Sequence, residues 1–165
     1  MVQIRYCQFC GNLNQYGYID GNNRYHCLNC SAIHYQNPKP TATLLCIENN
    51  QILLGRRALP PKRGLWGLLG GFVELNETLD EAATRELKEE SNLNGNLKKI
   101  IGTCSHFNSI FGDVLLIGIL MKIKTWDNML ASDDVSELKF FNLEETPKMA
   151  FKCHQDFINI YKKMR

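Results

Sequence analysis

Two C-x2-C pairs constrain the first part of this chain more than any other feature of its sequence. Cys7 and Cys10 form one pair and Cys27 and Cys30 the other, with sixteen residues between the pairs. Residues 5–36 contain few aliphatic side chains, so a hydrophobic core cannot hold this segment folded. Four thiolates at this spacing are typical of a tetrahedral zinc site, which itself stabilises a small ribbon. We therefore expect a structural Zn²⁺ bound by the four cysteines, and disfavour disulfides and a redox-active pair.

The remaining composition is typical of a globular protein. The chain has 165 residues, of which 44% are apolar and 22% charged, and no segment approaches the roughly eighteen consecutive apolar residues of a membrane helix. Its first residues lack the pattern of an export signal, which predicts a cytoplasmic protein with reduced cysteines. Residues 1–40 carry only Arg5, Arg24 and Lys39 against Asp20. We therefore disfavour nucleic acid as a partner and favour packing or homodimerisation as the role of the ribbon.

A change of pattern at Thr41 divides the chain. Asn37-Pro38-Lys39-Pro40 stands before it, and a β-branched, apolar strand pattern follows. We therefore predict a ribbon at 1–36, a linker at 37–40 and a second domain at 41–165. In that domain the pattern predicts strands at 41–48, 51–57, 65–73, 100–107, 114–124 and 138–141, and helices at 78–91 and 151–163. This order predicts an α+β fold in which a mixed sheet is layered between helices (α/β/α).

The helix predicted at 78–91 carries acidic residues where its packing face should continue. Thr78 and Glu81 fit a capping box, and Asn92 can end the helix in the left-handed conformation. At about 100° per residue, one stripe holds first apolar and then acidic side chains: Leu79, Ala82, Ala83, Glu86, Glu89 and Glu90. Two such charges about 5 Å apart repel by roughly 3 kcal/mol at an effective dielectric near 20. A solvated acidic face is the ordinary explanation, but the shared stripe favours carboxylates that bind Mg²⁺ or Mn²⁺.

These residues resemble the signature of the Nudix hydrolases, G-x5-E-x7-R-E-U-x-E-E-x-G-U, in which U is a bulky aliphatic residue. The matching positions are Gly71, Glu77, Arg85, Glu86, Leu87, Glu89, Glu90 and Leu93, and only Asn92 departs, at the final glycine. The resemblance implies the layered Nudix fold and an enzyme, a pyrophosphohydrolase in which Mg²⁺ or Mn²⁺ promotes the attack of water on a diphosphate. It also implies roles for matched residues: metal ligation by Glu86, Glu89, Glu90 and the Gly71 carbonyl, and a structural pair of Glu77 with Arg85.

The general base stays open at this point. In this family it is either a glutamate of the signature or an acidic residue on a later loop. The candidates on that loop are Asp133, Asp134 and Glu137. Each of them also fits a solvated surface position.

Basic and aromatic side chains are the candidates for binding the substrate. Four cations lie within eight residues before the signature, where a loop can hold a diphosphate or simply be solvated: Arg56, Arg57, Lys62 and Arg63. Four aromatic residues can stack a nucleotide ring, with core packing as the alternative: Trp66, Phe107, Phe111 and Phe151. Three separate cysteines are expected to be buried free thiols: Cys46, Cys104 and Cys153. His106 and His154 receive no role from the sequence.

A ribbon joined to this signature resembles two Nudix groups, the NADH pyrophosphatases and shorter ribbon-bearing enzymes that include FAD and ADP-ribose diphosphatases. Residues 30–39 and 145–151 resemble the shorter group. The Pro-rich stretch of the NADH enzymes is absent at 105–112, and Asn108 stands near the place of a proline that marks many ADP-ribose hydrolases. FAD or ADP-ribose is the first expected substrate, NADH the second, and nucleoside triphosphates or capped RNA follow. A non-enzymatic nucleotide sensor with a partner-binding ribbon is the alternative of another class, disfavoured because every glutamate of the signature is present.

Overall fold

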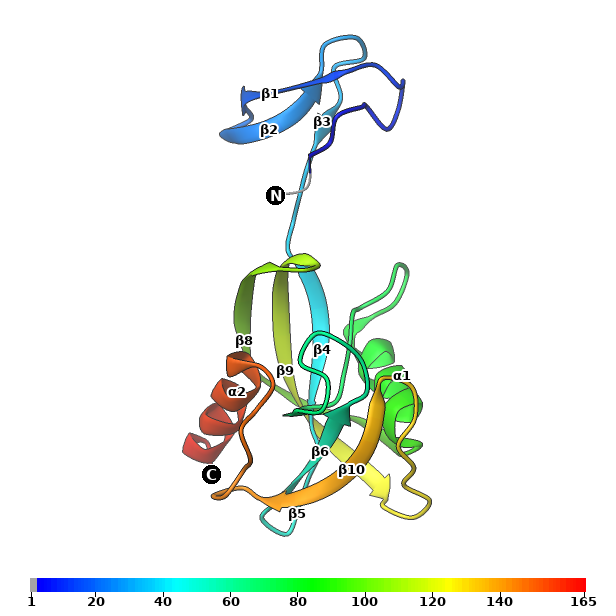
Figure 1. Ribbon diagram of the computed structural model, residues 1–165, viewed down its shortest axis with the longest axis vertical. Coiled ribbons are helices and arrows are strands. Elements are labelled where there is room, and N and C mark those ends of the chain that lie inside the picture. Colours follow the sequence, from blue (N-terminus) through cyan, green and yellow to red (C-terminus); the bar gives the residue numbers. More distant parts are fainter. Residues whose placement is uncertain (1–2) are drawn as a thin grey trace.

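An extended segment separates two β-containing parts of the chain (Figure 1). The computed structural model describes residues 3–165, so residues 1 and 2 of the predicted ribbon lie outside it. The smaller part is an antiparallel sheet in the order β1-β2-β3, formed by β1 (Asn14–Ile19), β2 (Asn22–Cys27) and β3 (Ile33–His34). Most of its side chains are exposed, as expected of a ribbon without a hydrophobic core.

The larger part contains a mixed sheet, as predicted from the order of strands and helices in the sequence. Its strands lie in the order β4-β9-β8 and are β4 (Lys39–Leu45), β9 (Gly112–Thr125) and β8 (Asn94–Ser109). β4 pairs with β9 in parallel, and β8 pairs with β9 antiparallel. A second, antiparallel sheet has the order β10-β6-β5 with β7 on β6: β10 (Val135–Asn142), β6 (Gln51–Arg57), β5 (Ile47–Glu48) and β7 (Trp66–Gly67).

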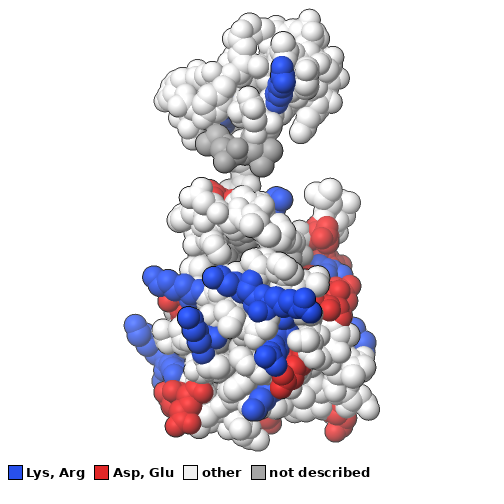
Figure 2. All heavy atoms as spheres, viewed as in Figure 1, with Lys and Arg blue, Asp and Glu red and all other residues white. Residues whose placement is uncertain are grey.

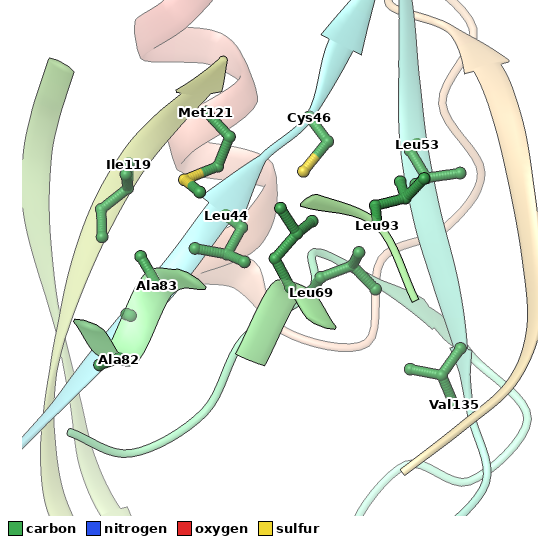
Figure 3. Close-up of a cluster of buried hydrophobic side chains, with 12 residues drawn as sticks. Leu44, Cys46, Leu53, Leu69, Ala82, Ala83, Leu93, Ile119, Met121 and Val135 are labelled. Atoms are coloured by element: carbon green, nitrogen blue, oxygen red, sulfur yellow. The ribbon is translucent and has the colours of Figure 1, made fainter. Parts of the chain in front are cut away.

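Two helices, α1 (Leu79–Ser91) and α2 (Lys152–Lys163), cover opposite faces of the strands. Alternation along β4 explains this arrangement, since Leu44 packs with α1 in one buried cluster and Leu45 packs with α2 in another. Figure 3 shows the first cluster, in which side chains from α1, β4, β6 and β9 converge. The expected α/β/α layering is therefore present. Neither helix of the described chain is long and apolar enough to cross a membrane.

Local signals fix both ends of α1. Thr78 caps the first turn, because its hydroxyl accepts from the Glu81 amide while the Glu81 carboxylate accepts from the Thr78 amide at 2.8 Å. Asn92 ends the helix with φ 57°, and its amide donates to Lys88 O at 2.9 Å. The predicted capping box and the left-handed stop are both present.

The loop before β10 packs on the C-terminal turn of α1. Carbonyl oxygens in the last turn of a helix have no partner within that helix. Here Leu130 N donates to Ser91 O at 3.0 Å, and Ser132 N donates to Glu90 O at 3.3 Å. These contacts bring the next two residues of the loop, Asp133 and Asp134, beside the acidic end of the helix.

Some segments differ from their sequence-based prediction. The strand expected at 41–48 is divided at Cys46, because the chain passes there from the mixed sheet into the second sheet. The region expected as strand at 65–73 is mostly loop; Gly70 has φ 122°, and a Cβ there would lie 2.0 Å from a carbonyl oxygen of β4. β8 begins before the expected Ile100, because bulges interrupt its alternation and hide the strand pattern.

Candidate active site and cysteine cluster

The four cysteines of the ribbon form one cluster. The Sγ atoms of Cys7, Cys10, Cys27 and Cys30 all lie within 4.8 Å of one another, and none of these residues is in a disulfide. Hydrogen bonds from the backbone and side chain of Asn12 lower the pKa of Cys10 to about 6, whereas hydrogen bonds with Cys10 and Cys7 raise the pKa of Cys30 to about 12 against the effect of the Ala32 amide. Four sulfurs about 2.3 Å from a shared ion have separations of this kind, so the donor set fits a tetrahedral Zn²⁺.

Arg85 on α1 holds three glutamates of the predicted active site. Its Nε and Nη2 donate to the two carboxylate oxygens of Glu77 at 2.7 and 2.9 Å, and its Nη1 donates to Glu86 at 2.7 Å and to Glu89 at 2.9 Å. Nη2 also donates to the Phe72 carbonyl at 3.0 Å, which ties the helix to the preceding loop. The hydrogen bonds from Arg85 lower the pKa of Glu77 to about 2, whereas burial raises the pKa of Glu86.

Glu90 is buried and has no cationic partner among the described residues. Its Oε2 accepts from Gly70 N at 2.7 Å. Burial raises the pKa of Glu90 to about 8, and the charges of Glu86, Asp134 and Asp133 act in the same direction. This carboxylate therefore lacks a counter-charge, which a divalent cation can supply.

The faces of α1 differ from the predicted ones. Glu89 is exposed, with 47% of its side chain accessible, although the sequence placed it inward with the other two glutamates of the stripe. Leu87 and Ser91, which the predicted stripe does not include, are buried. The buried stripe therefore passes through these two residues, four positions apart, and Glu89 lies outside it.

The carboxylates of Glu86, Glu89 and Glu90 are suitable ligands for a divalent cation, but they do not lie as close together as the four thiols. Within residues 3–165, only the cysteines form a group of three or more ligands within 4.8 Å, since Arg85 holds two glutamates and Gly70 N the third. Mg²⁺ usually takes one or two carboxylates and keeps several waters, so a converged set is not required. Gly71 makes room here, because a Cβ would lie 2.5 Å from Glu86 Oε1; its carbonyl accepts from Ala42 N at 2.9 Å.

A cleft of about 770 Å³ opens beside Glu90. Its walls come from β6, from the tip of the β8–β9 hairpin and from the start of α2. The lining combines acidic, basic, aromatic and imidazole side chains, among them Glu90, Asp134, Arg57, Lys62, Phe72, Phe107, Phe111, Phe151 and His154. A ligand in this cleft meets cations for an anionic group and rings for a planar one.

Of the two adjacent arginines on β6, Arg57 lines the cleft and Arg56 does not. Arg57 Nε donates to Pro61 O at 2.8 Å, and its guanidinium carbon lies 5.3 Å from the centre of the Phe151 ring. Arg56 is half-exposed and pairs with Glu137, with 3.3 Å between Nη1 and Oε2. Successive side chains of a strand point to opposite faces, so these two arginines cannot both face the cleft.

Arg63 and Trp66, two other predicted substrate residues, also lie outside the cleft lining. Trp66 packs edge-on against Phe141, with ring centres 4.9 Å apart, and adjoins the buried cluster under α2. Core packing, the alternative weighed for this ring, is therefore what the structure shows. Arg63 is exposed on the loop that follows β6.

The three loop candidates for the general base occupy different environments. Asp134 lines the cleft, and its charge acts on Glu90. Asp133 is exposed beside it. Glu137 is engaged by Arg56 outside the cleft. Asp134 is thus the only one of the three among the cleft-lining residues.

His154 is a cleft residue that the sequence left unassigned. It is buried, and its Nδ1 accepts from Leu68 N at 2.9 Å. Burial, with smaller contributions from Arg57 and His106, lowers the pKa of His154 to about 3, so the ring is neutral at physiological pH. The two bonded residues are 86 positions apart, and no local pattern indicates such a contact.

Comparisons with known proteins agree with this geometry. A family model described as NUDIX domain matches residues 38–160. An ADP-ribose pyrophosphatase of Methanocaldococcus jannaschii is 35% identical over 128 residues, covering 77% of this chain and 75% of that protein. The NAD-capped RNA hydrolase NudC of Vibrio cholerae is 25% identical over 151 residues, and this chain spans only 52% of it. A crystal structure of a NUDIX hydrolase from Nitrosomonas europaea has a TM-score of 0.83 at 30% identity, covering 98% of this chain and 92% of that one.

Proposed function

We propose that this chain, which belongs to the Nudix family, hydrolyses the diphosphate bond of a nucleoside diphosphate derivative, with ADP-ribose or FAD as first candidates. The substrate class is supported by the 35% identical relative named ADP-ribose pyrophosphatase. The observation that carries the proposal is the buried carboxylate of Glu90, which lines a cleft that also presents Arg57, with the buried Glu86 four residues before it on α1. The uncompensated negative charge of Glu90 next to a cation-lined cleft suits a metal-bound diphosphate.

The two parts of the chain have different tasks in this proposal. Residues 1–36 form a zinc ribbon, 37–40 a linker and 41–165 the catalytic domain, although β4 already begins at Lys39. The four cysteines bind one structural Zn²⁺, and a closed four-thiolate site leaves no position for water. Such a site suits the reducing cytoplasm.

The ribbon serves packing or homodimerisation in this proposal, and nucleic acid is not its partner. Among its described residues, the charged side chains are Arg5, Asp20 and Arg24. Figure 2 shows Lys and Arg side chains gathered over the larger domain and very few on the ribbon. A surface that tracks phosphates needs more cations than this.

Glu86, Glu89 and Glu90 hold Mg²⁺ or Mn²⁺ in this proposal, with the Gly71 carbonyl as a further ligand. When bound, these ions neutralise charge on the diphosphate and lower the pKa of a water molecule. Arg85 orients Glu86 and Glu89 through its Nη1. In the same way, Glu77 fixes Arg85 through two hydrogen bonds.

Arg57 and Asp134 complete the reacting groups. Arg57 is held by Pro61 O and by the Phe151 ring, which leaves its guanidinium oriented for a phosphate oxygen. Asp134 accepts the proton of the water that attacks phosphorus. The bond between that phosphorus and the bridging oxygen then breaks, and two phosphomonoesters leave.

NADH and NAD-capped RNA form the second candidate class. The NudC relative supports it, because its alignment covers 89% of this chain. The small charge of the ribbon speaks against a long RNA, as argued above. ADP-ribose and FAD therefore remain the first candidate substrates.

A substrate panel tests the proposed function. Purified protein with Mg²⁺ or Mn²⁺ is incubated with ADP-ribose, FAD, NADH and nucleoside triphosphates, and the phosphomonoester products are separated and quantified. We expect turnover of ADP-ribose or FAD to exceed that of the others. Tight nucleotide binding without turnover of any compound would instead identify a nucleotide sensor and exclude the enzyme.

Arg57→Gln and Arg56→Gln form a matched pair that tests the phosphate contact. Arg57→Gln should lower kcat/KM for the best substrate roughly 10- to 100-fold, because a charge-assisted hydrogen bond contributes about 1.5–3 kcal/mol. Arg56→Gln should stay within about threefold of wild type, because the ion pair with Glu137 and the hydrogen bond to Gly64 O that it removes both lie outside the cleft lining. Steady-state kinetics on both variants measures kcat/KM. An equal fall of kcat/KM in the two variants would contradict the assignment of Arg57 as the phosphate contact.

A further inference from the structure

His154 presents one ring nitrogen to the cleft and keeps the other for the fold. Nδ1 accepts a hydrogen bond from Leu68 N, and a backbone amide can only donate. Nδ1 therefore carries no proton, and the neutral ring carries its proton on Nε2. The side chain of His154 is thus a fixed N–H donor whose tautomer is set by the main chain.

The Nε2 atom of His154 has no acceptor among the described residues. The buried side-chain atoms that lack a partner are Asn14 Oδ1, His26 Nδ1 and His34 Nε2. His154 Nε2 makes no hydrogen bond and is not one of these buried atoms, so it is accessible to solvent. The ring lines the cleft, although the residue as a whole is only 8% exposed. Its N–H therefore opens onto the cleft, where a bound ligand can accept from it.

The ring of His154 and Arg57, the cation proposed to bind phosphate, share a neighbouring aromatic residue. Both contact Phe151: the guanidinium carbon of Arg57 is 5.3 Å from the centre of the Phe151 ring, and that centre is 5.2 Å from the centre of the His154 ring. The same wall thus presents a cation and, next to it, a neutral donor. A group attached directly to a phosphate on Arg57 reaches the donor, and in a nucleoside diphosphate derivative that group is a sugar or polyol.

We propose that His154 is a specificity-determining residue, whose Nε2–H donates to a hydroxyl or ether oxygen of the sugar or polyol esterified to the diphosphate. This proposal rests on the proposed function of the cleft. A neutral donor suits an uncharged acceptor, while the phosphate is left to Arg57. Gly67 supports the placement of the ring, because a Cβ there would lie 3.1 Å from His154 Nδ1.

Two substitutions separate the fold contact from the ligand contact. In His154→Asn, the amide oxygen replaces Nδ1 as the acceptor for Leu68 N, and the donor at the Nε2 position is lost. In His154→Gln, the amide nitrogen replaces Nε2 as the donor, and the acceptor for Leu68 N is lost. A ligand role and a fold role therefore rank the two variants in opposite orders.

The dissociation constant of ADP-ribose in the presence of EDTA, measured by calorimetry, and the melting temperature are the readouts. We expect His154→Asn to weaken ADP-ribose roughly three- to tenfold, the loss of one neutral hydrogen bond, and to melt near the wild type. His154→Gln should bind within about twofold of wild type and melt lower. The proposal would be overturned if His154→Gln, the variant with the lower melting temperature, also bound ADP-ribose more weakly, or if both variants bound it with equal affinity.

Inorganic pyrophosphate identifies the part of the ligand that is read. It has phosphates and no sugar, so His154→Asn should leave its affinity unchanged while Arg57→Gln weakens it. Weakening of pyrophosphate by His154→Asn would show that the donor reads phosphate and would refute the sugar contact. If the wild type binds ADP-ribose without turnover, the proposed enzyme fails and the ranking of variants still decides the role of His154. Absence of any ADP-ribose binding by the wild type would overturn the proposal for His154, whereas the substrate panel with Mg²⁺ or Mn²⁺ decides the proposed enzyme.

Discussion

Glu90→Gln is expected to lower kcat for the best substrate roughly a thousandfold or more, because a metal site supplies several kcal/mol of transition-state stabilisation and each 1.4 kcal/mol is about tenfold in rate. Glutamine keeps the shape of Glu90 and can still accept from Gly70 N. It cannot supply the charge that holds a divalent ion. Glu74→Gln is the matched control, because Glu74 is exposed near the same site and should stay within about twofold.

The same substitution should stabilise the metal-free protein at neutral pH. The folded state holds the pKa of Glu90 at about 8, above the ordinary value of 4.5. Below pH 4.5 both states are protonated and there is no penalty. As pH rises toward 8 the unfolded state ionises first, so the free energy of unfolding of the wild type falls, by an amount on the order of a few kcal/mol. Glu90→Gln removes this dependence.

Urea unfolding in EDTA at pH 5 and at pH 8 measures the effect, beside the kinetic assay. Glu90→Gln should be more stable than wild type at pH 8, with a much smaller difference at pH 5. Glu74→Gln should follow the wild type at both values. Near-normal kcat in Glu90→Gln would contradict the metal assignment, and an unchanged pH dependence would contradict the burial of an uncompensated carboxylate.

Local signals made the position of α1 predictable. They did not predict which side chains of its last turn are buried. Thr78, Glu81 and Asn92 act within four residues of the ends of the helix, and the signature fixes the spacing of the glutamates. Which glutamates are buried depends on the partners of the helix. Glu89 is drawn to Arg85 at the edge, while Ser91 is covered by the loop before β10.

The cleft depends on contacts between residues far apart in the chain, and these have no local pattern. β4 pairs in parallel with β9, with Lys39 opposite Val114, and such a pairing joins segments that no short-range rule connects. The choice between Arg56 and Arg57 depends on which face of β6 meets the cleft. His154 became recognisable only through its bond to Leu68 N, since a lone histidine in a terminal helix predicts nothing specific.

Cys27→Ser is expected to remove zinc from the chain and unfold the ribbon while the larger domain stays folded. Within residues 3–36 the only buried residues are Cys7, Cys27 and His34, and two of these are proposed zinc ligands. Structural zinc contributes about 10–16 kcal/mol in small finger peptides, which no other interaction of this ribbon replaces. Neither hydrophobic cluster of the domain contains a ribbon residue, so the domain does not depend on the metal.

Elemental analysis and amide hydrogen exchange on the full chain test this expectation. Zinc should be near one per chain in the wild type and in Cys104→Ser, a control cysteine of the larger domain, and near none in Cys27→Ser. Amides of β1 and β2, which form one antiparallel hairpin, should lose protection in Cys27→Ser, while those of α1 and β9 should keep it. Retained zinc with retained protection in Cys27→Ser would refute the four-thiolate site, because three sulfurs alone leave the tetrahedron open.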